Sequence, residues 1–386
     1  MRSVEKYVGP LRLVWAAGFG ALSLLAIFAA PTSQLWQVAV GVTGWGHMLA
    51  PVALLPLLPG WRLSKPGRSG AVLGLGAALL FLSPLIRALP IDAALPAQLS
   101  SAFGEPARPP ARPGPIVAAD LFRGVARPQI GPQTLSYSAA DGSELLLDLY
   151  PAQTAGPAPL VVMIHGGAWE GGSRDDLPAL NHYLAGRGYS VAAISYRFAP
   201  QHPFPAASAD VDAAIAFLRA NAAELAIDPS RIVLIGRSAG GHLALLSAYR
   251  HNDPAVRGVV SFYGPTDLHY GYANPRNPLV IETRRILEGF IAGTPETAAE
   301  QYSAASPISY VGPQTPPTLL LHGRRDELVW FADSERLAER LAAAGRPHLL
   351  VDLPWATHAM DFNFDGPDGQ ISTYAIEYFL NAVMDH

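Results

Sequence analysis

Residues 231–241 have the sequence Arg231-Ile-Val-Leu-Ile-Gly-Arg-Ser-Ala-Gly-Gly241. Arg231–Ile235 is a largely apolar run of strand length, and the helix-forming stretch His242–Arg250 follows it. Gly-x-Ser-x-Gly at a strand-to-helix turn is a nucleophile elbow, because small neighbours allow the strained turn that exposes the serine hydroxyl. Glycine next to serine is common in a chain with 36 glycines, so the assignment of Ser238 as a nucleophile depends on its surroundings.

Short apolar runs alternate with helical patterns on both sides of this turn, which is typical of a mainly parallel sheet covered on both faces. An alternating pair of strands with a hairpin signal between them comes first. The predicted strands are Thr134–Ser138, Glu144–Tyr150, Leu160–Ile164, Ser190–Ser195, Arg231–Ile235, Gly258–Phe262, Thr318–Leu321 and His348–Leu353. The helical patterns include Ser208–Asn221 and Phe331–Ala344. The sequence therefore predicts one α/β domain over residues 130–386.

The strand Leu160–Ile164 runs into His165-Gly-Gly-Ala-Trp169, where such a sheet supplies backbone amides to a reacting carbonyl. Acyl transfer builds negative charge on that oxygen, and N–H groups directed at it stabilise the charge. We predict an oxyanion hole formed by the amides of Gly167, Ala168 and Ala239. His165 is interpreted as a structural residue of the loop.

A serine nucleophile needs a base and a group that orients the base. Asp326 follows the strand Thr318–Leu321, and His358 follows the strand His348–Leu353, so both lie at the sheet edge where the elbow lies. The order Ser238, Asp326, His358 predicts a catalytic triad. Asp267 is the rival acid, and His322 is interpreted as a packing residue too close in sequence to Asp326 to be oriented by it.

These motifs together resemble the α/β-hydrolase superfamily, specifically hormone-sensitive-lipase-like (family IV type) carboxylesterases with an HGGxW oxyanion loop. The resemblance covers about residues 130–386 and includes Tyr196–Ala206, Asp228–Gly236 and Ala305–Pro307. It implies the α/β-hydrolase fold and hydrolysis of carboxylic esters, with no cofactor and no metal. Ala168 replaces the usual third glycine, and Arg237 stands where an acidic residue is common. The loop also resembles arylformamidases and isoprenylcysteine methylesterases, so amide or prenyl-protein ester substrates, and acyl transfer, stay open as alternatives.

The N-terminal quarter has a different composition. Residues 1–90 carry seven basic side chains and one acid, and contain apolar stretches at Leu13–Ala30, Leu35–Leu58 and Ala71–Ile86. A spanning helix needs ~20 residues, so these predict a membrane anchor of three transmembrane helices over residues 1–90. A Pro/Ala/Arg-rich linker is predicted over 91–129. A signal peptide cleaved near Ala29–Ala30 is the alternative for the first stretch.

Basic residues set the predicted orientation of the anchor. Arg2, Lys6 and Arg12 precede the first stretch, whereas Arg62, Lys65 and Arg68 lie between the second and third. The positive-inside rule then places the N-terminus inside and the catalytic domain on the extracytoplasmic side. If the third stretch is re-entrant, the catalytic domain is cytoplasmic instead.

Partners follow from the remaining patterns. The expected substrate is a small-molecule or lipid-like ester, short- to medium-chain, and the expected second partner is the membrane. The portion after residue 90 is acidic, which argues against nucleic acid, and the chain has no cysteine for disulfides. Trp169, Tyr270 and Tyr272 are the predicted substrate-pocket residues.

Overall fold

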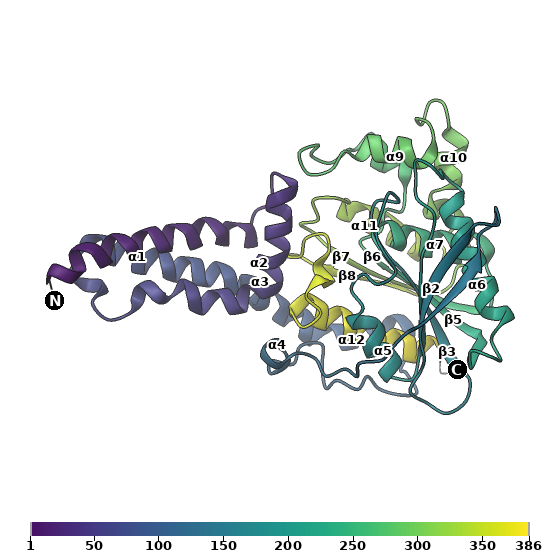
Figure 1. Cartoon of the computed structure of the whole chain (residues 1–386), viewed down its shortest axis with the longest axis horizontal. Helices are drawn as coiled ribbons and strands as arrows, with labels where there is room; N and C mark the ends of the chain where they lie inside the picture. The colour runs from purple at the N-terminus through teal and green to yellow at the C-terminus, as the bar shows by residue number, and fades with distance from the viewer. Residues whose placement is uncertain (1, 385–386) are drawn as a thin grey trace.

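The computed structural model describes residues 2–384 of the chain. The side chains of Arg2 and Lys6, which enter the orientation argument, lie outside the described residues, as do residues 385–386 of the predicted catalytic domain. The described chain forms a bundle of three long helices joined end-on to an α/β domain, with the N-terminus at the far end of the bundle (Figure 1).

The α/β domain is built on one eight-stranded sheet with the order β1-β2-β4-β3-β5-β6-β7-β8. The first three strands in this order pair antiparallel, and the pairs from β4 to β8 are parallel. The strands are β1 Gln133–Ser138, β2 Glu144–Tyr150, β3 Ala158–Ile164, β4 Ser190–Ile194, β5 Ile227–Arg237, β6 Val256–Phe262, β7 Thr318–Gly323 and β8 His348–Leu353. The α/β-hydrolase prediction, including its two leading antiparallel strands, is confirmed.

Two hydrophobic cores lie on opposite faces of this sheet. Successive residues of β3 alternate between them, since Val162 belongs to one core and Val161 to the other. Helices α6 (Ala206–Ala220), α7 (Ala239–His251) and α11 (Phe331–Ala343) cover the first face, and α5 (Ala179–Gly186) and α12 (Pro367–Met384) cover the second. A strand buried on both faces must be apolar throughout, which explains the near-continuous apolar runs of the sequence.

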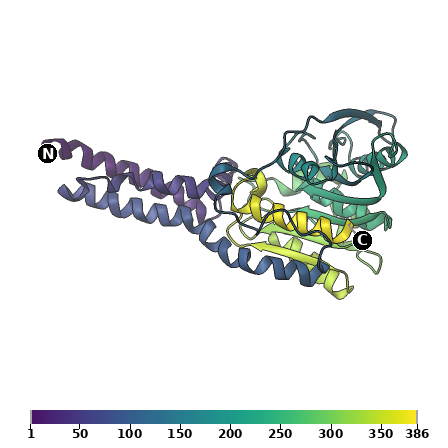
Figure 2. The ribbon, with the colours of Figure 1, turned by 90° about the horizontal axis from the view of Figure 1, so that it is seen from below.

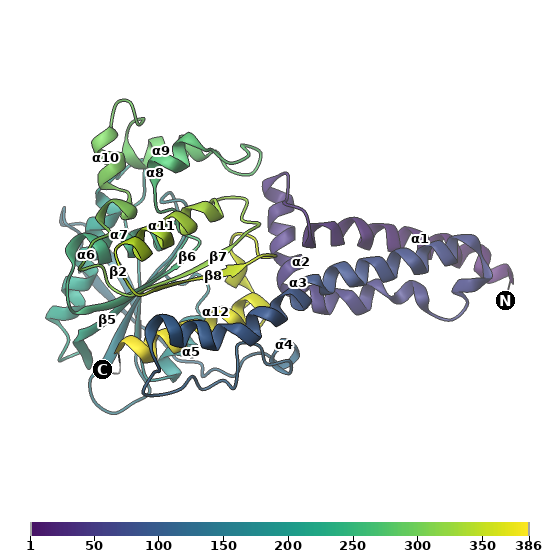
Figure 3. The ribbon, with the colours of Figure 1, turned by 180° about the vertical axis from the view of Figure 1, so that it is seen from behind.

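The first third of the predicted linker over residues 91–129 is helical. Helix α3 spans Lys65–Phe103 and continues from the bundle onto the second face of the sheet, where it lies beside α12 (Figures 2 and 3). Leu95 and Leu99 are fully buried in that core. Three prolines interrupt the helix, but Ser83 Oγ donates to Leu80 O at 2.7 Å, the carbonyl left without a donor by Pro84.

Residues 104–129 are also fastened to the domain rather than free. Ala111 N donates to Glu377 Oε1 at 3.0 Å, and Arg108 donates to Asn381 at 3.0 Å, both on α12. The short helix α4 (Asp120–Arg123) lies in this segment. The linker prediction is therefore wrong as to structure, because burial of leucines outweighs the proline content, at about 1.5–3 kcal/mol for each buried side chain.

The bundle consists of α1 (Arg2–Ser23), α2 (Ser33–Ala53) and the first part of α3, with short 3-10 turns η1 Leu24–Ala26, η2 Leu55–Leu57 and η3 Trp61–Leu63. All three helices are long and apolar enough to cross a membrane, in agreement with the predicted anchor. Helix α2 is kinked at Trp45, and its first half runs across the end of the bundle, against the α/β domain (Figures 1 and 3). A Cβ at Gly46 would overlap the Phe81 carbonyl, so glycine is required where α2 meets α3.

A cap over one edge of the sheet lies between β6 and β7. It comprises α8 (Leu268–Ala273), α9 (Thr283–Ile291), α10 (Ala299–Ala304) and the 3-10 turn η4 (Pro307–Tyr310). The last 3-10 turn of the chain, η5 (Met360–Phe362), precedes α12. Helix α9 begins at Thr283, and the residues before it form a turn in which Asn277 Oδ1 accepts from Leu279 N at 3.0 Å.

Candidate active site

Ser238 occupies the turn between β5 and α7, as the elbow motif predicts. Its φ is 52° and its ψ −120°, a strained left-handed conformation for a residue with a side chain. A Cβ on Gly240 would overlap the carbonyl oxygens of Ile164 and His165, so only glycine lets α7 begin this close to the end of β3. The turn directs the half-buried Ser238 side chain into a cavity.

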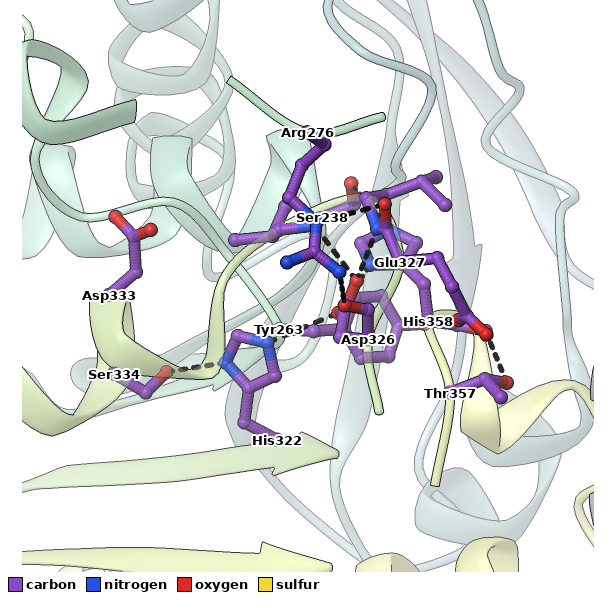
Figure 4. Close-up of polar contacts among 12 residues, drawn as sticks. Ser238, Tyr263, Arg276, His322, Asp326, Glu327, Asp333, Ser334, Thr357 and His358 are labelled. Carbon is purple, nitrogen blue, oxygen red and sulfur yellow. Dashed lines mark hydrogen bonds and ion pairs between the residues drawn. The ribbon is translucent and has the colours of Figure 1, made fainter. Parts of the chain in front are cut away.

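Three side chains from different loops form a hydrogen-bonded relay (Figure 4). His358 Nε2 lies 2.9 Å from Ser238 Oγ, and His358 Nδ1 lies 2.7 Å from Asp326 Oδ2. A carboxylate only accepts, so Nδ1 carries the proton and Nε2 is free to accept from the serine hydroxyl. The structure thus brings the three residues of the predicted triad together.

Asp326 is fully buried and is surrounded by donors. Its Oδ1 accepts from the backbone N of Leu328 and of Val329, each at 2.8 Å. Burial alone would raise the pKa of this carboxyl, but the neighbouring His358 and His322 hold the pKa well below its ordinary value. Asp326 is therefore ionised, and an ionised carboxylate is what accepts the hydrogen bond that orients a catalytic histidine.

His322 is hydrogen-bonded to the same carboxylate, which corrects its interpretation as a packing residue too close in sequence to Asp326 to be oriented by it. Its Nε2 lies 3.1 Å from Asp326 Oδ2, and its Nδ1 lies 2.8 Å from Ser334 Oγ (Figure 4). The turn after β7 folds the chain back, so four residues of separation suffice. The rival acid Asp267 lies elsewhere: it caps α8 and pairs with Arg336 at 2.7 Å.

The loop after β3 curves around the serine. Gly167, Ala168 and Trp169 all have positive φ (117°, 55° and 59°), an unusual run that turns the loop back at the strand end. A Cβ on Gly166 would lie 3.3 Å from Ser238 Cβ, which shows how close the loop comes to the elbow. The oxyanion hole formed by the amides of Gly167, Ala168 and Ala239 stays a prediction that this geometry accommodates.

Trp169 and His165, at the two ends of this loop, are each fixed by contacts with buried side chains. Trp169 Nε1 donates to His242 Nδ1 at 3.2 Å, and the Trp169 ring stacks on Phe290 at 4.4 Å. Burial lowers the pKa of His242 to about 4, so this histidine is neutral at pH 7. His165 stacks on Tyr196 at 4.4 Å, and burial lowers its pKa as well, consistent with a structural role.

A buried polar cluster lies beneath the relay. Arg237, next to the serine, pairs with Asp361, which also accepts from the Tyr263 hydroxyl. The Tyr263 ring packs on the His358 ring at 4.3 Å between centroids. Arg237 therefore connects the elbow to the loop that carries His358, and sequence analysis had identified Arg237 only as a departure from the family pattern.

The cavity above Ser238 has a volume of about 600 Å³, within the ~300–1,000 Å³ of small-molecule sites. Trp169 lines it, as predicted, but Tyr270 and Tyr272 do not. Helix α8 turns Leu268 and Gly271 toward the cavity, while Tyr270 lies against Arg336 and Tyr272 donates to Glu288 Oε1 at 2.7 Å.

Many other lining residues were missed by sequence analysis, among them Trp36, Arg276, Trp330 and Phe362. Trp36 comes from α2 of the bundle, and no local pattern relates it to residues of the α/β domain. Among residues 2–384, no group of three or more His, Asp or Glu side chains is arranged to hold a metal ion.

The strained serine, the relay and the cavity define an enzyme of the α/β-hydrolase fold. The chain belongs to the BD-FAE family, whose model matches residues 147–341. It is similar to the probable carboxylic ester hydrolase LipM of Mycobacterium tuberculosis, with 29% identity over 94% of this chain and 93% of LipM. Esterase LipC of the same organism is 34% identical, over 59% of this chain and 59% of LipC.

Solved structures agree with this assignment. A thermophilic esterase from Thermogutta terrifontis matches with a TM-score of 0.53 and 27% identity, over 64% of this chain and 91% of that one. A hyperthermophilic esterase from Pyrobaculum calidifontis shares the fold, with a TM-score of 0.58 and 23% identity, over 68% of this chain and 87% of that one. The chain is accordingly an enzyme of the carboxylic ester hydrolase class.

Proposed function

We propose that this chain is a membrane-anchored serine esterase that hydrolyses carboxylic esters through Ser238, His358 and Asp326. The observation that carries the proposal is the relay of two hydrogen bonds, 2.9 and 2.7 Å long, at the floor of a 600 Å³ cavity. The buried Asp326 carboxylate and the strained serine turn have no simpler structural explanation.

The chemistry takes two acyl-transfer steps. Ser238 Oγ attacks the ester carbonyl while its proton moves to His358 Nε2, and Asp326 stabilises the imidazolium. The C–O bond to the alcohol then breaks, and the alcohol leaves with the proton from His358. Water attacks the acyl-enzyme as His358 takes its proton, the acid is released, and Ser238 regains its hydrogen. The amides of Gly167, Ala168 and Ala239 stabilise the oxyanion in both steps.

The catalytic domain is proposed to lie on the extracytoplasmic side. Arg12 Nη2 donates to Pro59 O at 2.9 Å, so the basic N-terminal segment meets the basic connection 60–70 at one end of the bundle. The α/β domain is joined to the opposite end (Figure 1). A single orientation therefore puts both basic segments inside and the cavity outside, which favours this side over the cytoplasmic alternative.

The test is turnover by the full-length chain in detergent micelles. Helix α3 runs from the bundle into the core of the α/β domain, where Leu95 and Leu99 are buried, so the whole chain is used. Wild type is expected to hydrolyse p-nitrophenyl butyrate, and Ser238→Ala is expected to lose roughly 10⁴-fold or more in kcat/KM. Full activity in Ser238→Ala would remove this serine from the mechanism. A folded wild type that cleaves aryl formamides but no ester would be an amidase instead, and ester formation with added alcohol would indicate an acyltransferase.

A further inference from the structure

The active-site cavity is completed by a helix of the membrane anchor. Trp36 lies in the first half of α2, and its ring centroid is 6.3 Å from that of His358. Two hydrogen bonds hold the start of α2 against the cap: Ser33 N donates to Leu279 O, and Asn277 Nδ2 donates to Pro31 O, both at 3.0 Å. The anchor therefore contributes a wall of the cavity as well as a tether.

The exposed apolar surface of the α/β portion is concentrated on the same side. Among the described residues after 104, the large apolar side chains that are exposed are Phe122 (64%), Leu146 (36%), Leu279 (67%), Trp330 (40%) and Phe362 (56%). Four of these five lie against the bundle or at the cavity mouth, and Leu146 on β2 is the exception. The rings of Phe122 and Phe362 contact His47 and Trp45 of α2, at 5.6 and 6.1 Å between centroids.

Of the remaining two apolar side chains, Trp330 lines the cavity, and Leu279 lies in the cap segment that contacts α2. Leu279 is joined to α2 through Ser33, and Trp330 is fixed by a hydrogen bond from its Nε1 to Asn274 O at 2.7 Å. The Arg276 guanidinium covers the Trp330 ring at 3.6 Å. Exposed apolar side chains gathered on one side of a protein are found where it meets a membrane or a partner.

The position of the bundle identifies which of these it meets. Its three helices extend away from the α/β domain on this side, so a bilayer crossed by the bundle lies against the same side (Figures 1 and 3). The first half of α2 runs across the bundle end, with Leu35 and Val38 exposed beside the cavity wall. An apolar helix face in this place is suited to the membrane interface.

We infer that the cavity opens to the bilayer and takes an ester with a long apolar chain from that same bilayer, with Trp36 as a wall of the chain-binding part. This inference rests on the proposed esterase function and names its substrate class. An apolar chain that enters from the lipid past Trp330 and Phe362 reaches Ser238 without crossing water. Trp36 then selects for long chains by apolar contact.

The test compares a membrane-partitioned ester with a water-soluble one that has the same leaving group. Full-length protein is reconstituted into vesicles of ether-linked phosphatidylcholine, which contains no ester of its own. Turnover is measured in three arms. In the first, p-nitrophenyl palmitate is in the vesicles that hold the protein; in the second, it is in vesicles without protein that are mixed with the protein vesicles. In the third, p-nitrophenyl butyrate is added in solution. Fluorophosphonate labelling of active protein corrects each variant for its folded fraction.

The expected result for Trp36→Ala is a roughly 10-fold fall in the palmitate-to-butyrate ratio of kcat/KM, at the low end of discrimination by apolar pocket contacts. Trp61→Ala, in η3 at the far end of the bundle, is the matched control and keeps the wild-type ratio. Wild type is expected to cleave palmitate ester faster from its own vesicles than from separate ones.

Equal ratios in Trp36→Ala and Trp61→Ala, or equal rates from the same and separate vesicles, would overturn the inference while leaving the esterase proposal intact. If wild type shows no Ser238-dependent turnover of either ester, the esterase proposal itself is overturned.

Discussion

Replacing Arg237 tests the buried cluster beneath the relay. The side chains of Arg237 and Asp361 are 7% and 6% exposed, and they pair directly, with Tyr263 as a second donor to Asp361. Arg237→Met leaves the Asp361 carboxylate buried with one neutral donor. Breaking a buried pair from one side costs about 3–5 kcal/mol, because the remaining charge is uncompensated. Tyr263 also packs on His358, so displacement of the cluster is expected to lower kcat.

The assay is thermal unfolding of the full-length protein in detergent, followed by circular dichroism and by residual ester turnover. At ~2–4 °C for each kcal/mol, the midpoint of Arg237→Met is expected to fall by roughly 6–20 °C. Two variants serve as controls. Arg219→Met breaks an exposed pair with Asp253 and is expected to cost at most about 1 kcal/mol.

The second control removes the whole cluster. Arg237→Met combined with Asp361→Leu and Tyr263→Phe leaves no buried charge and is expected to recover most of the lost stability. The reasoning would be refuted if Arg237→Met lowered the unfolding midpoint no more than Arg219→Met does. It would also be refuted if the triple variant unfolded at a lower temperature than Arg237→Met.

Three further predictions concern the elbow, α3 and α12. Gly240→Ala is expected to abolish turnover, because its Cβ overlaps the Ile164 carbonyl; wild-type kcat in this variant would contradict the close approach. Leu99→Ala is expected to lower the free energy of unfolding by about 2–5 kcal/mol, measured by denaturant titration, since Leu99 is fully buried; a change below about 1 kcal/mol would show that α3 does not belong to the core. Burial raises the pKa of Asp368 to about 8 despite the hydrogen bond from Trp355. A raised pKa of a buried carboxyl makes the folded protein less stable as pH rises from about 4 to 8. In that range the carboxyl has already released its proton in the unfolded chain but still holds it in the folded chain. Asp368→Asn is therefore expected to gain thermal stability relative to wild type between pH 5 and pH 8, and identical pH slopes would argue against the shift.

The sheet and the relay could be predicted because their signals are local. Each buried strand is an apolar run closed by turn residues, and Ser238, Asp326 and His358 each follow such a run. Parallel strands bring their carboxyl ends to one edge, so placement after a strand is enough to bring the three side chains together.

The parts that could not be predicted depend on tertiary contacts. The prolines from residue 90 onward favour a linker by composition, but α3 continues past Pro90 and Pro96 to Phe103 because Leu95 and Leu99 are buried in the core that α12 covers. Tyr270 and Tyr272 are aromatic residues near the site, yet the orientation of a six-residue helix turns them away. Trp36 reaches the cavity only because α2 kinks at Trp45 and crosses the end of the bundle.

The most direct test of the account is covalent labelling of the full-length protein with a fluorophosphonate, followed by intact mass measurement and peptide mapping. The account predicts one adduct per chain, on Ser238, with simultaneous loss of ester turnover and no adduct in Ser238→Ala. An adduct on a different serine, or ester turnover that persists in fully labelled protein, would contradict it.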